Sequence, residues 1–202
     1  MLGEWMMKKD DQFYWDMQRY IAVNTIGPSV LRNQGSADVI KAARNYLAGI
    51  DLGGFRTKDE WTFLKVLDTT TEKLKRTLPR GAQNWGAARK ACNLFLRDIC
   101  YNRFLCQRYG LEESEEWMEI PLDGLVATAL KRKGQRGGLP PWPGLKGLTP
   151  EISAKFQAFA RQVAAEQGIS RVHLDMRLWT TERERNGEQS ASADALPRAA
   201  EW

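Results

Sequence analysis

The chain of 202 residues is long enough for one domain or at most two small ones, and its 43% apolar and 27% charged residues are typical of a globular protein. Its apolar runs are too short for a membrane span, and its first residues lack the apolar core of a secretion signal. The net charge is +5, and because residues 182–202 contribute −2, the preceding residues carry +7 and suit a polyanionic partner.

Helical spacing of the apolar residues predicts an all-α fold with no strand pair. Ser36 and Thr149 are expected N-caps, and Gly110 and Gly168 are expected to follow helix ends. The segment 86–109 is apolar on most of its sides, which favours a central position. The predicted helices cover residues 8–22, 28–33, 37–48, 57–67, 69–77, 86–109, 124–132, 150–166 and 170–179.

Cysteine and histidine usage argues against a metal site. Cys92, Cys100 and Cys106 are not in CxxC form and are expected to be small buried residues in a reducing cytosol. The single histidine, His173, excludes a His-rich metal site, argues against a Ser–His–Asp triad and suits a core or capping position. Acidic residues do not cluster at ligand spacing, so we expect no metal and no cofactor. The polar residues 182–202 are expected to be disordered.

Two charged stretches flank the predicted helix 124–132. An acidic run occupies residues 112–119, and its sequence suggests no function. The segment 131–150 is rich in Gly and Pro and holds five positive charges and no negative one. It is either a loop that contacts a polyanion or an ordinary solvated stretch.

Residues 78–96 read LPRGAQNWGAARKACNLFL. The part GAARKACNLFL resembles the hairpin and second helix of the helix-hairpin-helix DNA glycosylases, the endonuclease III superfamily. In that superfamily a Gly-rich hairpin enters a helix beginning Gly-x-Gly-Arg-Lys. The matching residues are Gly86, Arg89, Lys90, Asn93 and Leu96.

Three more segments resemble the same superfamily in the same order. LRNQG at 31–35 resembles the segment whose Gln enters the duplex where a base has left, and Gln34 is the match. IPLDGLVATAL at 120–130 resembles the segment that carries the catalytic aspartate, which matches Asp123. The last predicted helix, SRVHLDMRLW, is similar to the closing helix near the base pocket.

The resemblance implies two helical lobes in one domain of residues 1–181, with a helix-hairpin-helix motif at about 68–109 and a base pocket in the cleft between the lobes. The chain departs from the pattern in a longer hairpin and in Ala88, which replaces the second Gly. Lys90 and Asp123 are 33 residues apart, a spacing similar to that of a long-insert branch with archaeal 8-oxoguanine glycosylases. The four-cysteine pattern of an iron–sulfur cluster is absent from the sequence.

Base excision requires the nucleotide to leave the stack, which calls for phosphate contacts, a wedge and an aromatic pocket. The hairpin glycines let backbone N–H groups approach phosphate, or serve only the geometry of a turn. The wedge candidate, Gln34, is alternatively a simple loop amide. The DNA-binding candidates are Gln34, Gly81, Asn84, Gly86, Arg89, Lys131, Arg132 and Lys133.

Two residues are candidates for the chemistry itself. A carboxylate at Asp123 would stabilise the cation-like sugar, although Asp before a helix is also a common N-cap. An amine at Lys90 would attack the sugar to form a Schiff base and then cleave the strand. Alternatively, Lys90 holds a phosphate or belongs to a solvated polar stripe with Asn93 and Arg97.

The base-pocket candidates are Trp142, Asp175 and Trp179. Trp142 is either a stacking residue or a plug of its Pro-rich loop, and Asp175 is either a pocket residue or a first-turn charge on the helix dipole. The expected function is excision of a modified base from double-stranded DNA, by a monomer in the cytoplasm at a bacterial or phage genome. Candidate substrates are glucosylated hydroxymethylcytosine and 8-oxoguanine. A non-catalytic helical DNA-binding module, or a helical protein without a nucleic-acid role, are the alternatives.

Overall fold

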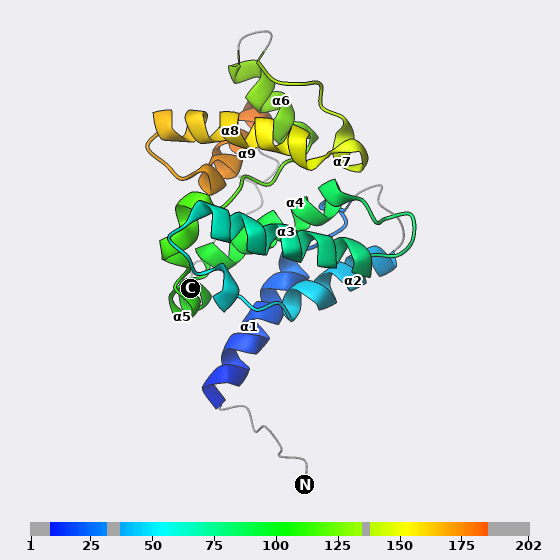
Figure 1. The fold of residues 1–202 in the computed structure, drawn as a ribbon, viewed down its shortest axis with the longest axis vertical. Coiled ribbons are helices and arrows are strands. Elements are labelled where there is room, and N and C mark those ends of the chain that lie inside the picture. The colour runs from blue at the N-terminus through cyan, green and yellow to red at the C-terminus, as the bar shows by residue number, and fades with distance from the viewer. Residues whose placement is uncertain (1–8, 32–36, 135–137, 186–202) are drawn as a thin grey trace, which may run out of the picture.

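The computed structural model describes residues 9–31, 37–134 and 138–185, and the regular elements of these residues are all helical (Figure 1). The expected all-α fold is confirmed. Among the described residues, no helix combines the length and apolar character needed to cross a bilayer. The helices are α1 (Lys9–Thr25), α2 (Ala37–Ala48), α3 (Glu60–Thr77), α4 (Trp85–Tyr101), α5 (Arg103–Tyr109), α6 (Gly124–Lys133), α7 (Gly144–Gly147), α8 (Pro150–Glu166) and α9 (Leu174–Arg185), with 3-10 turns η1 (Gly53–Phe55), η2 (Leu111–Trp117) and η3 (Arg171–His173).

Two separate clusters of buried apolar side chains organise these helices. The first cluster is built from α1 to α5 and the second from α6, α8 and α9 with the loop before α8. Figure 1 shows α6 to α9 gathered at one end of the molecule and α1 to α5 at the other. The chain crosses between the clusters from Met118 to Ile120, and again from Val172 to Leu174. Residues near these crossings are therefore where the two groups of helices meet.

The boundaries of several predicted helices were wrong, including 170–179, where the structure has η3 followed by α9, which continues to Arg185. The predicted helix 86–109 is two helices, because Asn102 leaves the helical region and its side chain caps α5 by accepting a bond from the Leu105 amide. The predicted helices 57–67 and 69–77 are one, α3, because the threonine hydroxyls at 69–71 bond to carbonyls one turn earlier and leave the helix unbroken.

Residues 28–30 form a turn where a short helix over 28–33 was expected, and Val30 donates its amide to the Gly27 carbonyl. Ser36, the expected cap of α2, lies outside the described residues. Thr149 does cap α8, since its hydroxyl accepts a bond from the Ile152 amide at 3.3 Å.

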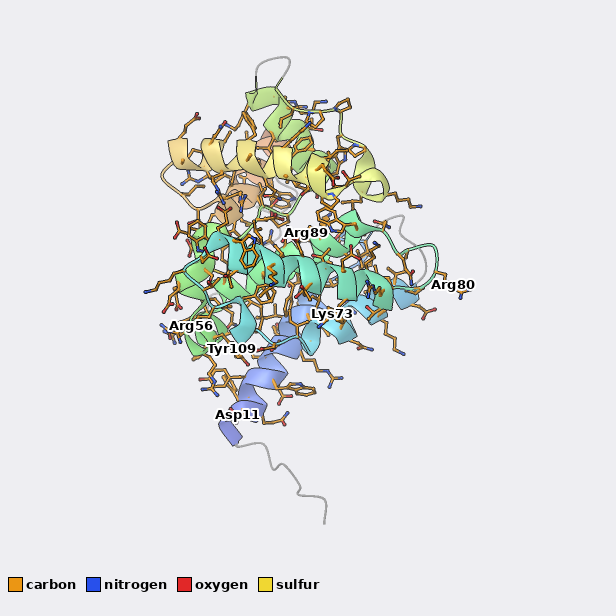
Figure 2. All side chains as sticks on the ribbon, in the orientation of Figure 1. Asp11, Arg56, Lys73, Arg80, Arg89 and Tyr109 are labelled. Atoms are coloured by element: carbon orange, nitrogen blue, oxygen red, sulfur yellow. The ribbon has the colours of Figure 1, made fainter. Side chains whose placement is uncertain are left out.

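A tight connection joins α3 to α4, which pack against each other. Ala82 donates to the Pro79 carbonyl at 3.0 Å, and Gly81 adopts a φ of 89°, a value that favours glycine. Arg80 projects outward from this turn (Figure 2). Asn84 then caps α4 by accepting a bond from the Ala87 amide at 2.9 Å.

The first turn of α4 also touches the second group of helices through Gly86. A Cβ at this position would lie 2.3 Å from the Leu145 carbonyl oxygen and 2.7 Å from the Leu148 Cβ. Both are backbone-proximal atoms that cannot swing away. Glycine therefore permits the close approach of α4 to α7.

Replacing Gly86 by Ala is expected to lower the free energy of unfolding by about 1–3 kcal/mol, because the added methyl group overpacks this contact. Urea denaturation measures the effect. The matched control is Gly27→Ala, where a Cβ meets nothing within 4 Å, and it should leave stability unchanged or slightly raised. Equal losses in the two variants would refute the role of Gly86 in this approach.

Candidate functional site

A cavity of about 360 Å³ lies where the two groups of helices meet, a size within the range of small-molecule sites. Its walls come from α4, α9, the turn after α1 and the segment that leads into α6. The lining residues are Ser29, Val30, Lys90, Leu94, Arg97, Pro121, Asp123, Asp175, Met176 and Trp179. Four of them are ionisable, with two cations and two carboxylates facing one space.

Lys90 and Asp123 meet in this cavity. The Lys90 Nζ lies 3.2 Å from Asp123 Oδ2, and the lysine side chain is only 8% exposed. Asp123 is also the N-cap of α6, because its Oδ1 accepts a bond from the Val126 amide at 3.0 Å. The cap fixes one carboxylate oxygen and leaves the other for Lys90. The capping role and a role in the cavity are therefore compatible for Asp123.

Arg97 and Asp175 form a second pair in the cavity, one that the sequence motifs did not assign. Arg97 lies two turns after Lys90 on α4 and bonds to Asp175 Oδ2 of α9. It also pairs with Asp98 at 2.8 Å, and Asp98 accepts a bond from the Thr25 hydroxyl. The i to i+7 spacing of Lys90 and Arg97 was the available sequence signal for this position.

The pKa of Asp175 is raised to about 6, mainly by burial and in smaller part by the nearby Asp123 carboxylate, while Arg97 and Lys90 oppose the shift. The side chain of an aspartate ordinarily loses its proton at a pH well below this value. Asp175 thus changes charge close to neutral pH, as groups in functional sites often do. Protonated, it donates a hydrogen bond, and ionised, it accepts one.

This raised pKa predicts a pH-dependent stability. Between pH 3.8 and about 6 the folded protein holds a proton on Asp175 that the unfolded chain has lost, so stability falls as pH rises through this range. The Asp175→Asn variant should lack this fall. From pH 4 to pH 7 the wild type should lose about 2 kcal/mol of unfolding free energy relative to the variant in urea denaturation. Parallel pH profiles would contradict the assigned burial of this carboxylate.

Two large apolar side chains of the cavity lining are exposed. Trp179 and Met176 are 45% and 46% exposed, and both line the cavity from α9. An exposed aromatic ring at a cavity with charged walls is a surface on which a planar ligand can stack.

Trp142 does not belong to this site. Its ring packs edge-on against Phe156 with centroids 5.7 Å apart, beside the second cluster of buried residues. Of the two roles considered for Trp142, this packing fits the plug of its own loop, because the ring does not line the cavity.

Arg89 is likewise placed differently from the expected phosphate contact. It is 5% exposed and makes a two-pronged ion pair with Glu119, at 2.8 Å and 3.0 Å, and a third bond to Asp68 at 2.7 Å. Figure 2 shows Arg89 at the level where the two groups of helices meet. Its donors are engaged within the protein, so it joins the helices together and does not face a ligand.

The acidic run thereby acquires a structural role. Glu119 is buried and also accepts a bond from the Asn93 amide at 3.0 Å. Glu115 binds His173 of η3 at 2.9 Å, and Glu113 pairs with Arg56. The carboxylates of this run thus hold neighbouring elements in place.

The remaining expected DNA contacts do not line the cavity. Gly81 and Asn84 form the turn and cap before α4, and Gly86 is covered by α7. Lys131–Lys133 form the exposed last turn of α6, at the opposite end of that helix from Asp123 and about 12 Å away along its axis (Figure 1). Gln34 lies outside the described residues. Among the described residues, no group of three or more Asp, Glu, His or Cys side chains is placed to hold a metal ion.

Comparison of the chain with protein-family models, with curated proteins and with solved structures found no match.

Proposed function

We propose that this protein is a DNA glycosylase, and that the cavity between its two groups of helices receives a modified base extruded from double-stranded DNA. The observation that carries the proposal is the contact of Lys90 Nζ with Asp123 Oδ2 at 3.2 Å, inside a cavity that an aromatic side chain borders. Such a pair suits cleavage of a glycosidic bond, because the amine is the nucleophile and the fixed carboxylate stabilises the charge on the sugar. The resemblance of both segments to the endonuclease III superfamily supports the same conclusion.

The proposed reaction begins with transfer of a proton from Lys90 to Asp123. The free amine then attacks C1′ of the sugar, and the bond to the base breaks with its electron pair moving to the base, which takes up a proton. Opening of the sugar ring yields an imine between Lys90 and C1′, and loss of a C2′ proton expels the 3′ phosphate. The departing base takes its proton from Asp123, and the restored Asp123 carboxylate stabilises the positive charge that develops on the sugar.

The walls of the cavity would recognise the base. Trp179 offers a stacking face, Arg97 offers N–H donors, and Asp175 offers either a donor or an acceptor depending on pH. Such a mixed polar edge reads the hydrogen-bonding groups of an extruded base. Glucosylated hydroxymethylcytosine and 8-oxoguanine are the substrates we propose to test first, with the protein acting as a monomer on a bacterial or phage genome.

Duplexes that each carry one modified base test this function. They hold 8-oxoguanine, uracil, an alkylated purine, hydroxymethylcytosine or its glucosylated form, and each is end-labelled. After incubation with the protein, each sample is divided and analysed with and without hot alkali. We expect strand breaks without alkali, which report excision followed by cleavage through Lys90.

Breaks that appear only after alkali would support a glycosylase that does not cleave the strand, and Lys90 would then have no strand-cleavage role. Tight binding of every duplex, with unchanged DNA even for genomic DNA of phages that modify their cytosines, would favour the non-catalytic DNA-binding module. If every substrate stays uncut and the protein shows no salt-dependent binding to DNA, both assignments are overturned.

A further inference from the structure

A second cavity, of about 310 Å³, lies between α1 and α2. Its lining contains three cationic side chains and one amide, with no carboxylate among them. The lining residues are Arg19, Val23, Pro28, Ile40, Lys41, Arg44, Asn45 and Ala48. A cavity with apolar walls that is lined by positive charges attracts an anion more strongly than the same charges on a flat surface.

The three cations sit on facing helices. Arg19 comes from α1, and Lys41 and Arg44 lie one turn apart on α2. Arg44 is anchored by a bond from its Nε to the Ile26 carbonyl at 2.7 Å, and Arg19 lies over the Trp15 ring at 5.5 Å. Within the described part of the chain, none of the three forms an ion pair with a carboxylate.

The acidic side chains of the same helices do not line this cavity. Asp16, one turn before Arg19, accepts a bond from Gln12 at 3.0 Å, and Asp38 precedes Lys41 by one turn. The cations therefore face the hollow without a matching negative group in its lining, and their positive charge is available to a ligand.

One short turn separates this cavity from the candidate active site. Pro28 lines the basic cavity, and the next two residues, Ser29 and Val30, line the cavity that holds Lys90 and Asp123. The two cavities therefore adjoin at residues 28–30, so a phosphate that flanks a nucleotide in the main cavity would lie near the basic one.

We propose that the α1–α2 cavity binds backbone phosphates of the DNA whose extruded base occupies the main cavity. The choice of DNA as the polyanion rests on the proposed function. Arg19, Lys41 and Arg44 supply the charge, and the Arg44 bond to Ile26 ties their position to the turn between the two cavities.

The test uses the full chain and a short duplex with a central abasic-site analogue, titrated at salt concentrations between about 50 and 200 mM. The variant Arg19→Gln/Lys41→Gln should weaken binding, and the slope of log affinity against log salt should become shallower by about 2, because each lost phosphate contact removes close to one released counterion. Arg44→Gln, made separately because of its backbone contact, should reduce the slope by about 1.

The control variant is Lys58→Gln/Lys155→Gln, which removes the same charge from two exposed positions that line neither cavity. Its slope should equal that of the wild type. A cavity variant with the slope of the control, or a wild type with no salt-dependent binding to the duplex, overturns the inference.

Excision of the duplex panel is scored separately. If the protein excises a base but the cavity variant keeps the wild-type slope, the proposed function stands and this inference is contradicted. If the slope changes as expected but no base is excised, the cavity stands as a DNA-binding site and the proposed glycosylase activity is contradicted.

Discussion

Replacing Asp123 by Asn should lower the rate of base excision roughly 10²- to 10⁴-fold, the range in which a positioned acid–base group contributes. The asparagine removes the charge that stabilises the sugar cation and the acceptor of the Lys90 proton, 3.2 Å away. Asn is as good an N-cap as Asp, so α6 should remain capped and stability should change little. Single-turnover excision at saturating protein measures the rate.

The chain supplies a matched control for this substitution. Asp59 caps α3 through a bond from the Thr62 amide to its carboxylate, and it lies outside the cavity. Asp59→Asn therefore makes the same chemical change at the same kind of helix position. It should excise at the wild-type rate, and equal losses in the two variants would show that a general effect of replacing a capping carboxylate, not the chemistry of Asp123, explains the result.

Replacing Glu119 by Gln should lower the free energy of unfolding by about 3–5 kcal/mol. The Arg89 guanidinium is 6% exposed and would lose its two-pronged partner, which leaves a buried charge with Asp68 as its remaining carboxylate. Burial of this kind makes removal of one partner costly even where the intact pair adds little to stability. Urea or thermal unfolding measures the change.

The control for this prediction is a more exposed ion pair, between α3 and α8. Arg161 and Glu60 are 43% and 34% exposed, so Glu60→Gln should cost at most about 1 kcal/mol. A loss in Glu119→Gln no larger than in Glu60→Gln would contradict the assignment of Arg89 and Glu119 as the buried joint of the fold.

The helical class and most helix positions could be predicted because they depend on local spacing and capping. Thr149 signalled the start of α8 through its own hydroxyl, and apolar residues on most sides of α4 signalled its burial. Asn102 was missed because an N-cap inside an apolar segment looks like any polar helix residue until the backbone departs from the helix.

The candidate site could be predicted in part, and the failures share one cause. The motifs led us to expect Lys90 and Asp123 in one site, and they lie in contact. The motifs do not show which other side chains face the cavity, because this depends on charged partners from distant segments. Arg89 matched a DNA-binding motif and is bound instead by Glu119, which the sequence placed in an acidic run without function. The cavity between α1 and α2 has no sequence signature, because it exists only where two helices pack.

Covalent trapping tests most directly whether Lys90 and Asp123 form an active site. Each duplex of the panel is incubated with the protein in the presence of borohydride, which reduces an imine to a stable amine. We expect a protein–DNA adduct with the substrate duplex, mapped by peptide mass to Lys90 and absent from Lys90→Gln. Excision without any adduct, at a rate that Lys90→Gln leaves unchanged, would contradict the proposed role of the pair.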